Sequence, residues 1–486
     1  MIRPPQGGNM KVYDFLFVGA GISGPFIAKE LCGAGAQCLM VEAGRLYHRH
    51  TYPRNSLDGN ANLYWAGGME LGADAKIAFL RPKVVGGGSI VNQALVDRFD
   101  AEAWAGWQAA SGVDWFNAQD MAPWYDAAES EIEIREIPPA FSNENARIFD
   151  QGFKALGFSN APLRRAQADC RLEEGNCCIE CLNGCRLGSK QSTPETVLKT
   201  ALENGLTLVP RVEAREIRFR RDGRVELRGR DARGGLTVHW GRNLVLGAGS
   251  VGNSALLLRS GLGPKPLWKR LLGRGEAGLP VGRGFYCHPQ FMSFGIYDRP
   301  IKSHMGAFQA FKSDDTGFRR QGFKLENVYA GPEGIAVLLP GFGKRHHKYM
   351  EKLDHFACME VCTRDAKPGK ITLDGRGEPC IHKPLRRDDR ARYLKGRAII
   401  TEIFKTTGAR EIIHGRFGIG LHLMGGCAMG TDPAQSVVDL EFRLHGRDNV
   451  FIADSSIFPN APGINPSLTI MALSKRAAQS ILRRHS

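Results

Sequence analysis

The sequence lacks the features that mark a membrane-spanning or secreted chain. It has no uninterrupted apolar stretch long enough to cross a bilayer. Its first apolar run has neither a charged segment before it nor a cleavage site behind it. Its twelve cysteines are mostly scattered, as at Cys32, Cys38 and Cys427, which is typical of unpaired thiols in a reducing compartment. These absences predict a cytoplasmic protein.

The sequence also lacks a basic arm and any motif of a nucleic-acid-binding module. The net charge of +15 is dispersed, with its densest basic runs at residues 211–233, 344–348 and 383–397. The first of these runs alternates charged and apolar residues about a central Asp-Gly, which predicts an exposed antiparallel hairpin. We expect no nucleic-acid partner. Peripheral contact with an anionic membrane surface or an acidic partner is the alternative explanation of the charge.

What the chain does have is length and an ordinary globular composition. It contains 486 residues, of which 43% are hydrophobic and 24% charged, enough for two domains. Near the start, residues 12–18 read as a buried parallel strand that runs into the glycine-rich sequence GAGISG. Residues 25–31 then read as a helix. A second strand, residues 37–41, ends in an acidic residue.

This strand, turn and helix predict a dinucleotide site. Glycines at the turn let the backbone approach a pyrophosphate at the helix N-terminus, and an acidic residue about twenty positions on accepts hydrogen bonds from a ribose. The residues in these positions are Gly19, Gly21, Ser23, Gly24 and Glu42. An ordinary glycine-rich turn is the alternative.

Two segments near the other end each place one polar side chain in apolar, glycine-rich surroundings. They are LHLMGGCAMG at residues 421–430, with His422, and INPSLT at residues 464–469, with Asn465. Together these side chains could hold an alcohol hydroxyl beside a redox cofactor, because histidine is the group suited to take its proton. The alternative for His422 is a buried histidine with a structural role.

From these segments the chain resembles the glucose-methanol-choline (GMC) family of FAD-dependent oxidoreductases, from about residue 11 to the C-terminus. Further segments match in order: KVVGGGSIVN at 83–92, LGAGS at 246–250 with LLLRSG at 256–261, VGRGF at 281–285 before His288-Pro289, and VFIADSS at 450–456. The resemblance implies an α/β fold in which a Rossmann-type FAD-binding domain carries an α+β substrate domain roofed by a sheet. It implies further FAD contacts at Gly87, Gly88, Ser89, Asn92, Val212, Ala248, Asp454 and Pro466.

The order of segments predicts a discontinuous FAD-binding domain. Residues 11–100, 190–285 and 418–486 should build it, residues 286–417 should form the substrate-binding domain, and residues 101–189 should be a helical, cysteine-rich excursion. Strand-like stretches at residues 322–325 and 334–339 should belong to the roof.

The family resemblance also implies a reaction, the oxidation of an alcohol CH–OH to a carbonyl by hydride transfer to flavin N5. His422 would be the base, and Asn465 would donate a hydrogen bond to the oxygen. Asn465 resembles the sterol and long-chain alcohol branches, which favours a hydrophobic or bulky alcohol over sugar-like polyols. Glu326 and His288 are further cavity candidates, although Glu326 could equally be a surface residue at a strand end. Oxygen (an oxidase) or a redox partner (a dehydrogenase) would take the electrons. A non-catalytic flavoprotein scaffold is the alternative from another class.

A cysteine run at residues 177–185 stands apart from these motifs. Four thiols lie within nine residues, and the spacing of Cys178, Cys181 and Cys185 resembles part of a ferredoxin-type motif. The family resemblance includes both a branch that binds a [3Fe-4S] cluster here and a long-chain alcohol branch with a similar cysteine run. Three interpretations stay open: buried or disulfide-linked structural thiols, an iron-sulfur cluster that would pass electrons from a sugar or polyol dehydrogenase to a partner, and structural zinc. The flanking sequence favours the first.

Overall fold

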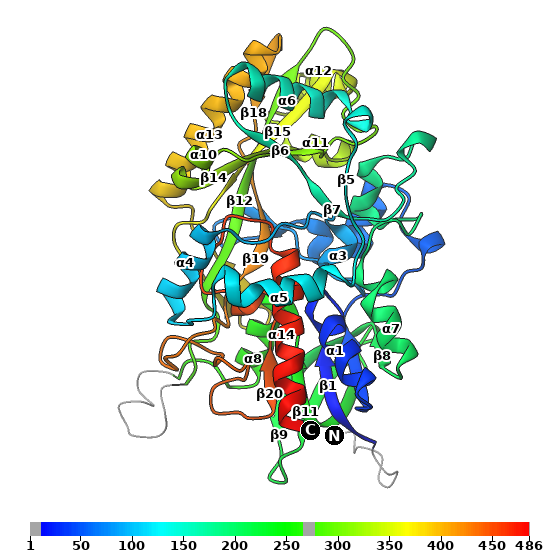
Figure 1. Ribbon diagram of the computed structural model, residues 1–486, viewed down its shortest axis with the longest axis vertical. Coiled ribbons are helices and arrows are strands. Elements are labelled where there is room, and N and C mark those ends of the chain that lie inside the picture. Colours follow the sequence, from blue (N-terminus) through cyan, green and yellow to red (C-terminus); the bar gives the residue numbers. More distant parts are fainter. Residues whose placement is uncertain (1–10, 266–277, 486) are drawn as a thin grey trace.

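The strands of the protein gather into two large sheets at opposite ends of an elongated molecule (Figure 1). The computed structural model describes residues 11–265 and 278–485. The mixed α/β architecture, with a Rossmann-type sheet and a second sheet above it, agrees with the predicted fold class.

The first sheet has the strand order β8-β2-β1-β11-β10-β9, and β20 pairs with β11. Its strands are β1 (Val12–Val18), β2 (Cys38–Glu42), β8 (Thr207–Pro210), β9 (Val212–Phe219), β10 (Val225–Asp231), β11 (Leu236–Leu246) and β20 (Val450–Ile452). The pairs β1–β2, β1–β11, β2–β8 and β11–β20 are parallel, and the apolar ends of β1 and β11 are fully buried, as expected for a sheet covered on both faces. The hairpin predicted in residues 211–233 is confirmed, because β9 and β10 pair antiparallel.

The second sheet has the order β3-β4-β19-β12-β15-β14-β13-β6, with β16 and β18 also paired to β12, and β17 paired to β16. Its strands are β3 (Glu70–Leu71), β4 (Ile77–Phe79), β6 (Asn160–Pro162), β12 (Arg283–Ile296), β13 (Phe311–Ser313), β14 (Phe323–Asn327), β15 (Phe356–Thr363), β16 (Gly369–Leu373), β17 (Pro379–His382), β18 (Glu411–His414) and β19 (Gly418–Met424). Strands β3, β4, β6 and β19 come from outside residues 286–417, so the roof draws on more of the chain than the sequence suggested.

Helices cover these sheets and fill the space beside them (Figure 1). They are α1 (Ser23–Gly33), α2 (Ser56–Leu63), α3 (Gly88–Val91), α4 (Ala101–Ser111), α5 (Ala118–Glu129), α6 (Glu144–Ala155), α7 (Val197–Glu203), α8 (Gly249–Arg259), α10 (Thr316–Gln321), α11 (Pro332–Leu338), α12 (Gly343–Met350), α13 (Arg387–Thr406) and α14 (Ser467–His485). A small separate sheet pairs β5 (Ile134–Glu136) with β7 (Arg164–Ala166). No helix within the described ranges is long and apolar enough to cross a membrane.

Alternation along β14 and β15 divides the roof sheet into two faces. Leu325, Val361 and Met359 point to one face, where they pack in a buried cluster with Ile400 and Phe404 of α13. Successive side chains of a strand point to opposite faces. The residues between them, which include Glu326 and Glu360, therefore face the other way, into the molecule.

The prediction of a strand at residues 334–339 is wrong, because this stretch forms helix α11. Pro332 occupies the first turn of the helix, where a missing N–H costs nothing. Ile335 and Leu338, one helical turn apart, are the buried residues of α11. The apolar residues there follow a helical period rather than the alternation of a strand.

Candidate active site

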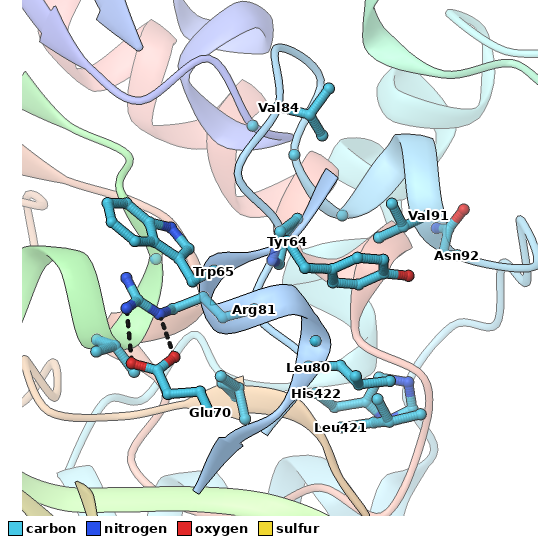
Figure 2. Close-up of a pocket in the computed structure, with 18 of the residues that line it drawn as sticks. Tyr64, Trp65, Glu70, Leu80, Arg81, Val84, Val91, Asn92, Leu421 and His422 are labelled. Atoms are coloured by element: carbon cyan, nitrogen blue, oxygen red, sulfur yellow. Dashed lines mark hydrogen bonds and ion pairs between the residues drawn. The ribbon is translucent and has the colours of Figure 1, made fainter. Parts of the chain in front are cut away.

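A cavity of about 950 Å³ joins the two sheets and collects most of the predicted site residues. The predicted residues that line it are Gly19, Gly21, Ser23, Glu42, Gly87, Gly88, Asn92, Val212, Ala248, Glu326, His422, Asp454, Asn465 and Pro466. Figure 2 shows part of its wall, where Leu421 and His422 lie beside Leu80 with Tyr64 and Asn92 nearby. The Arg81 side chain stabilises this wall. It donates two hydrogen bonds of 2.6 and 2.7 Å to Glu70 and stacks over Trp65.

The glycines of the first turn bring helix α1 against the sheet. A Cβ on Gly19, where φ is +96°, would lie 2.4 Å from the Gly247 carbonyl oxygen, and one on Gly24 would lie 2.4 Å from the Gly19 oxygen. Both positions therefore require glycine. A Cβ on Gly21 would meet nothing closer than 3.9 Å, so this residue borders open cavity. Its missing side chain leaves room for a ligand.

The residues around this opening fit the pyrophosphate of FAD. Ser23 starts helix α1, and its hydroxyl is buried with no hydrogen-bond partner among the described residues. A Cβ on Gly87 of the second glycine-rich loop would lie 2.7 Å from the Cα of Gly21, so the two loops touch. A phosphate there would meet the free N–H groups of the helix and the unpaired hydroxyl.

Glu42 sits at the carboxyl end of β2 with its carboxylate fixed by the backbone. Its oxygens accept hydrogen bonds from the N–H groups of Ala20, at 2.9 Å, and Gly44, at 2.7 Å. Burial raises the pKa of Glu42, which these two hydrogen bonds oppose. Each oxygen retains acceptor capacity, so the group fits the ribose role expected of it.

Asp454 and Ser89 make contacts within the protein. The Asp454 carboxylate accepts hydrogen bonds from the Gly249 N–H (2.7 Å), Asn253 (2.9 Å) and the Ser456 N–H (2.8 Å), so it fixes the loop that carries Ala248. The Ser89 hydroxyl donates to the Gly86 carbonyl and accepts from the Thr193 N–H, and Ser89 does not line the cavity. Direct contact of these two residues with the cofactor stays a prediction.

His422 and Asn465 reach the cavity from β19 and from the segment before α14. The backbone at His422 has φ of +55°, a left-handed conformation that costs energy in a residue other than glycine and that clusters at functional sites. Burial, followed by the nearby Lys324 ammonium, lowers the pKa of His422 to about 3. The imidazole is therefore neutral at physiological pH.

His288 does not line the cavity but lies directly behind His422. It is fully buried, and its Nδ1 is 2.9 Å from Nδ1 of His422. The Gly463 N–H donates to Nε2 of His288 at 3.0 Å. Neutral histidine carries one ring proton, so His288 holds its proton on Nδ1 and donates it to His422. In this arrangement the proton of neutral His422 is on Nε2.

Lys324 connects the cavity roof to Asn465. Its ammonium is 2.7 Å from Oε1 of Glu326 and also donates to Oδ1 of Asn465. Burial alone would lower the pKa of Lys324, but the Glu326 carboxylate raises it above its ordinary value, so the ammonium stays charged. Because Oδ1 faces Lys324, the amide N–H groups of Asn465 are left to donate to a ligand. No motif in the sequence marked Lys324.

Glu326 is a buried cavity residue rather than the exposed strand-end residue considered as its alternative. Only 1% of its surface is exposed, and its side chain lines the cavity at β14. Its neighbour across the sheet is Glu360 of β15, which also lines the cavity. No pattern in the sequence marked Glu360, because the pairing of β14 with β15 exists only in the folded chain.

The cysteine run does not fit an iron-sulfur or zinc site. Cys178 and Cys181 lie in a short 3-10 helix and face the buried guanidinium of Arg165, whose nitrogens lie 2.9 and 3.7 Å from their sulfurs. Within residues 11–265 and 278–485, no group of three or more His, Cys, Asp or Glu side chains is placed to hold a metal. All twelve cysteines, including Cys185, are described and free. The arrangement of these cysteines therefore does not support electron transfer through a cluster.

Comparisons with known proteins identify the family of the chain. Two family models described as GMC oxidoreductase match residues 13–290 and 369–474. An uncharacterized GMC-type oxidoreductase of Mycobacterium tuberculosis, Rv0492c, is 25% identical over 97% of this chain and 76% of its own length. The long-chain-alcohol oxidase FAO4B of Arabidopsis thaliana is 24% identical over 94% of this chain and 66% of its own length.

A solved structure shows the same fold. Pyridoxine 4-oxidase from Mesorbium loti superposes with a TM-score of 0.72 at 18% identity, covering 98% of this chain and 99% of that one. At this identity the likeness concerns the fold alone, whereas the family models together match well over half of the chain. The chain belongs to the GMC oxidoreductase family of flavoproteins.

Proposed function

We propose that this protein is an FAD-dependent oxidoreductase that oxidises the CH–OH group of an alcohol to a carbonyl. The observation that carries the proposal is one continuous cavity, which runs from the cradle around Gly21 and Ser23 to His422 and Asn465. Relatives include long-chain-alcohol oxidases, which supports an alcohol as substrate.

The cradle residues would hold the pyrophosphate and ribose of FAD, and the bound flavin would supply the acceptor for the hydride. His422 and Asn465 would hold the substrate oxygen. The Asn465 amide donates to that oxygen, because Lys324 occupies its other end. Donors that face an oxygen as it gains negative charge lower the barrier to hydride loss.

His422 has two candidate roles. As a base it would take the hydroxyl proton on Nε2, and its low pKa keeps it in the neutral form that this role requires. The contacts of His288 favour a second role, because they support the tautomer of His422 that carries its proton on Nε2. In that tautomer His422 donates to the oxygen, and the hydroxyl proton passes to water as the hydride leaves.

The overall reaction is tested with the purified, flavin-loaded protein. We expect a yellow protein whose flavin absorbance is bleached by a primary alcohol under anaerobic conditions and restored by oxygen or by an artificial acceptor. If oxygen restores the flavin absorbance as fast as the enzyme turns over, the protein is an oxidase. If only the artificial acceptor restores it, the protein is a dehydrogenase. A flavin that no alcohol bleaches would contradict the proposed function and favour a binding scaffold.

A further inference from the structure

The roof of the cavity carries a group of polar side chains of which the proposed reaction uses only Lys324. Strands β12, β15 and β14 are neighbours, and their register places Met292, Glu360 and Glu326 in one row across the sheet. The adjacent row, two residues along each strand, is Gln290, Cys362 and Lys324. Residues directly opposite in paired strands point to the same face. These rows therefore form one polar surface above the catalytic pair.

The acidic residues of this surface cannot turn away from the cavity. Glu326 is 1% exposed and Glu360 is 2% exposed, and both line the cavity together with Gln290. The opposite face of the same strands is packed against α13 in an apolar cluster. A buried charged group is stable only when it is paired or neutralised, so the ionisation of both carboxyls needs cations nearby.

The described part of the chain supplies one cation for the two carboxyls. Lys324 binds Glu326 and Asn465. Lys312 of β13 lies opposite Glu326 in the sheet, but its ammonium forms an ion pair with Asp97, which balances its charge. Burial first, and then the adjacent Glu326, raise the pKa of Glu360 well above its ordinary value. The empty site therefore favours the protonated form of Glu360 beside the Glu326 carboxylate.

A second observation indicates a ligand on the same surface. Oε1 of Gln290 is buried without a hydrogen-bond partner in the described residues, whereas its amide nitrogen contacts the Cys362 sulfur. Leaving a buried acceptor unpaired is energetically unfavourable. The surface therefore offers a protonatable carboxyl and a free carbonyl oxygen, both of which a hydrogen-bond donor with positive charge would satisfy.

We propose that the alcohol oxidised by this protein also carries a protonated amine, which binds Glu360 and Gln290 on the roof while the hydroxyl lies between His422 and Asn465. This inference rests on the proposed function. An ammonium group supplies the missing positive charge and several N–H donors. A neutral polyol supplies donors without the charge, and a long alkyl chain supplies neither.

Binding of the amine displaces a proton from Glu360. The titratable groups that face Glu360 are Glu326 and Lys324 of β14 and the thiols Cys358 and Cys362 of its own strand. From β12 it meets the uncharged Met292 and Gln290. Since the free site binds this proton and the occupied site does not, the KM for an amino alcohol should fall as pH rises from 6 to 8.5, by up to about tenfold per unit.

The test uses matched alcohols with the flavin-loaded protein. The ω-amino alcohols of three to eight carbons are compared with the diol of the same length and with the alkanol that ends in methyl. For at least one chain length we expect kcat/KM for the amino alcohol to exceed both controls by about tenfold or more. The KM for the diol should not follow the pH trend of the amino alcohol.

The variant Glu360→Gln removes the charge and keeps the size and hydrogen bonding of the side chain. We expect the ratio of kcat/KM between the amino alcohol and its diol to fall to near one. Glu402→Gln, on the exposed side of α13, is the control and should keep the wild-type ratio. The flavin content and melting temperature of each variant show whether it folds.

The outcomes separate this inference from the proposed function. If alcohols bleach the flavin but alkanols or diols are the better substrates at every chain length, the amine site is wrong. Retention of the amine preference in a folded Glu360→Gln variant, or a KM for the amino alcohol that is independent of pH, would also overturn it. If no alcohol of any series bleaches the flavin, the proposed function itself fails.

Discussion

The cofactor cradle and the polar roof lie at opposite ends of one cavity and are built in different ways. The cradle consists of backbone: Gly19, Gly21 and Gly87 are placed by turns that each span a few residues. The roof consists of side chains from β12, β14 and β15, which meet only because these strands pair in one register. The cradle is suited to a group that all members of a flavoprotein family share, whereas the roof can change residue by residue with the substrate.

A side chain that fills the cradle should have the largest effect. In Gly21→Val the new side chain projects into open cavity, because the protein atom nearest to an added Cβ is the Gly247 carbonyl oxygen at 3.9 Å. We expect a folded protein that contains no FAD and therefore has no activity. The absorbance ratio at 450 and 280 nm, together with the melting curve, measures this.

Gly375→Val is the matched control. Gly375 lies in the turn between β16 and β17, where a Cβ meets nothing within 4 Å and φ is not positive. This variant should retain the wild-type flavin content. A yellow Gly21→Val protein would show that the pyrophosphate lies elsewhere.

Replacement of His422 should have the next largest effect. His422→Ala removes the group at the substrate oxygen, and we expect flavin reduction to slow by about 100-fold to 10,000-fold while FAD stays bound. Stopped-flow absorbance under anaerobic conditions gives this rate. Reduction at the wild-type rate would remove His422 from the reaction.

His422→Gln separates the two roles of this residue. Glutamine keeps a hydrogen-bond donor but cannot take a proton at neutral pH. If His422 is a base, the Gln variant should be as slow as the Ala variant. If it is a donor, as the contacts of His288 favour, the Gln variant should recover at least about tenfold.

Lys324 joins the roof to the catalytic pair, so its replacement tests whether the two ends of the cavity are independent. In Lys324→Met the Asn465 amide loses the ammonium that fixes its orientation, and Glu326 loses its ion pair. We expect flavin reduction to slow by about tenfold to 100-fold. The exposed Lys405→Met on α13 should not change the rate. An unchanged rate in Lys324→Met would mean that Asn465 is oriented by other contacts.

The kcat/KM for a neutral alcohol should not change with pH below pH 7. An ordinary histidine has a pKa near 6.5, so the neutral fraction would fall about thirtyfold by pH 5. Burial and Lys324 lower the pKa of His422 to about 3, so the imidazole stays neutral at pH 5. We expect kcat/KM for a neutral alcohol to stay constant from pH 5 to 7. A loss of activity centred near pH 6.5 would show that the bound cofactor or substrate restores an ordinary pKa.

The smallest expected effect is the metal content of the cysteine run at residues 177–185. Arg165 faces Cys178 and Cys181 where a cluster would need open space, so protein purified without oxygen should contain no stoichiometric iron, acid-labile sulfide or zinc. Elemental analysis measures this. One iron-sulfur cluster per chain would show that these residues rearrange on binding it and would make a redox partner the electron acceptor.

Much of the fold could be predicted because its signals are local. The strand, glycine turn and helix at residues 12–33 need only the order of neighbouring residues, and the hairpin of β9 and β10 is marked by its own alternation. The same reasoning is wrong at α11, where a short apolar stretch predicts a strand but forms a helix. Apolar runs of six residues carry too little periodicity to separate the two structures.

By itself the sequence determined the family, the glycine cradle and the two segments that carry His422 and Asn465, because each is a contiguous motif with its own backbone geometry. The tertiary structure alone decided that His288 stands behind His422 and that Lys324, Glu326, Glu360 and Gln290 share the roof. These residues lie up to 134 positions apart in the sequence and meet through backbone pairing that no local pattern encodes. The charge balance in the cavity depends on that pairing, and so, we infer, does the choice of substrate.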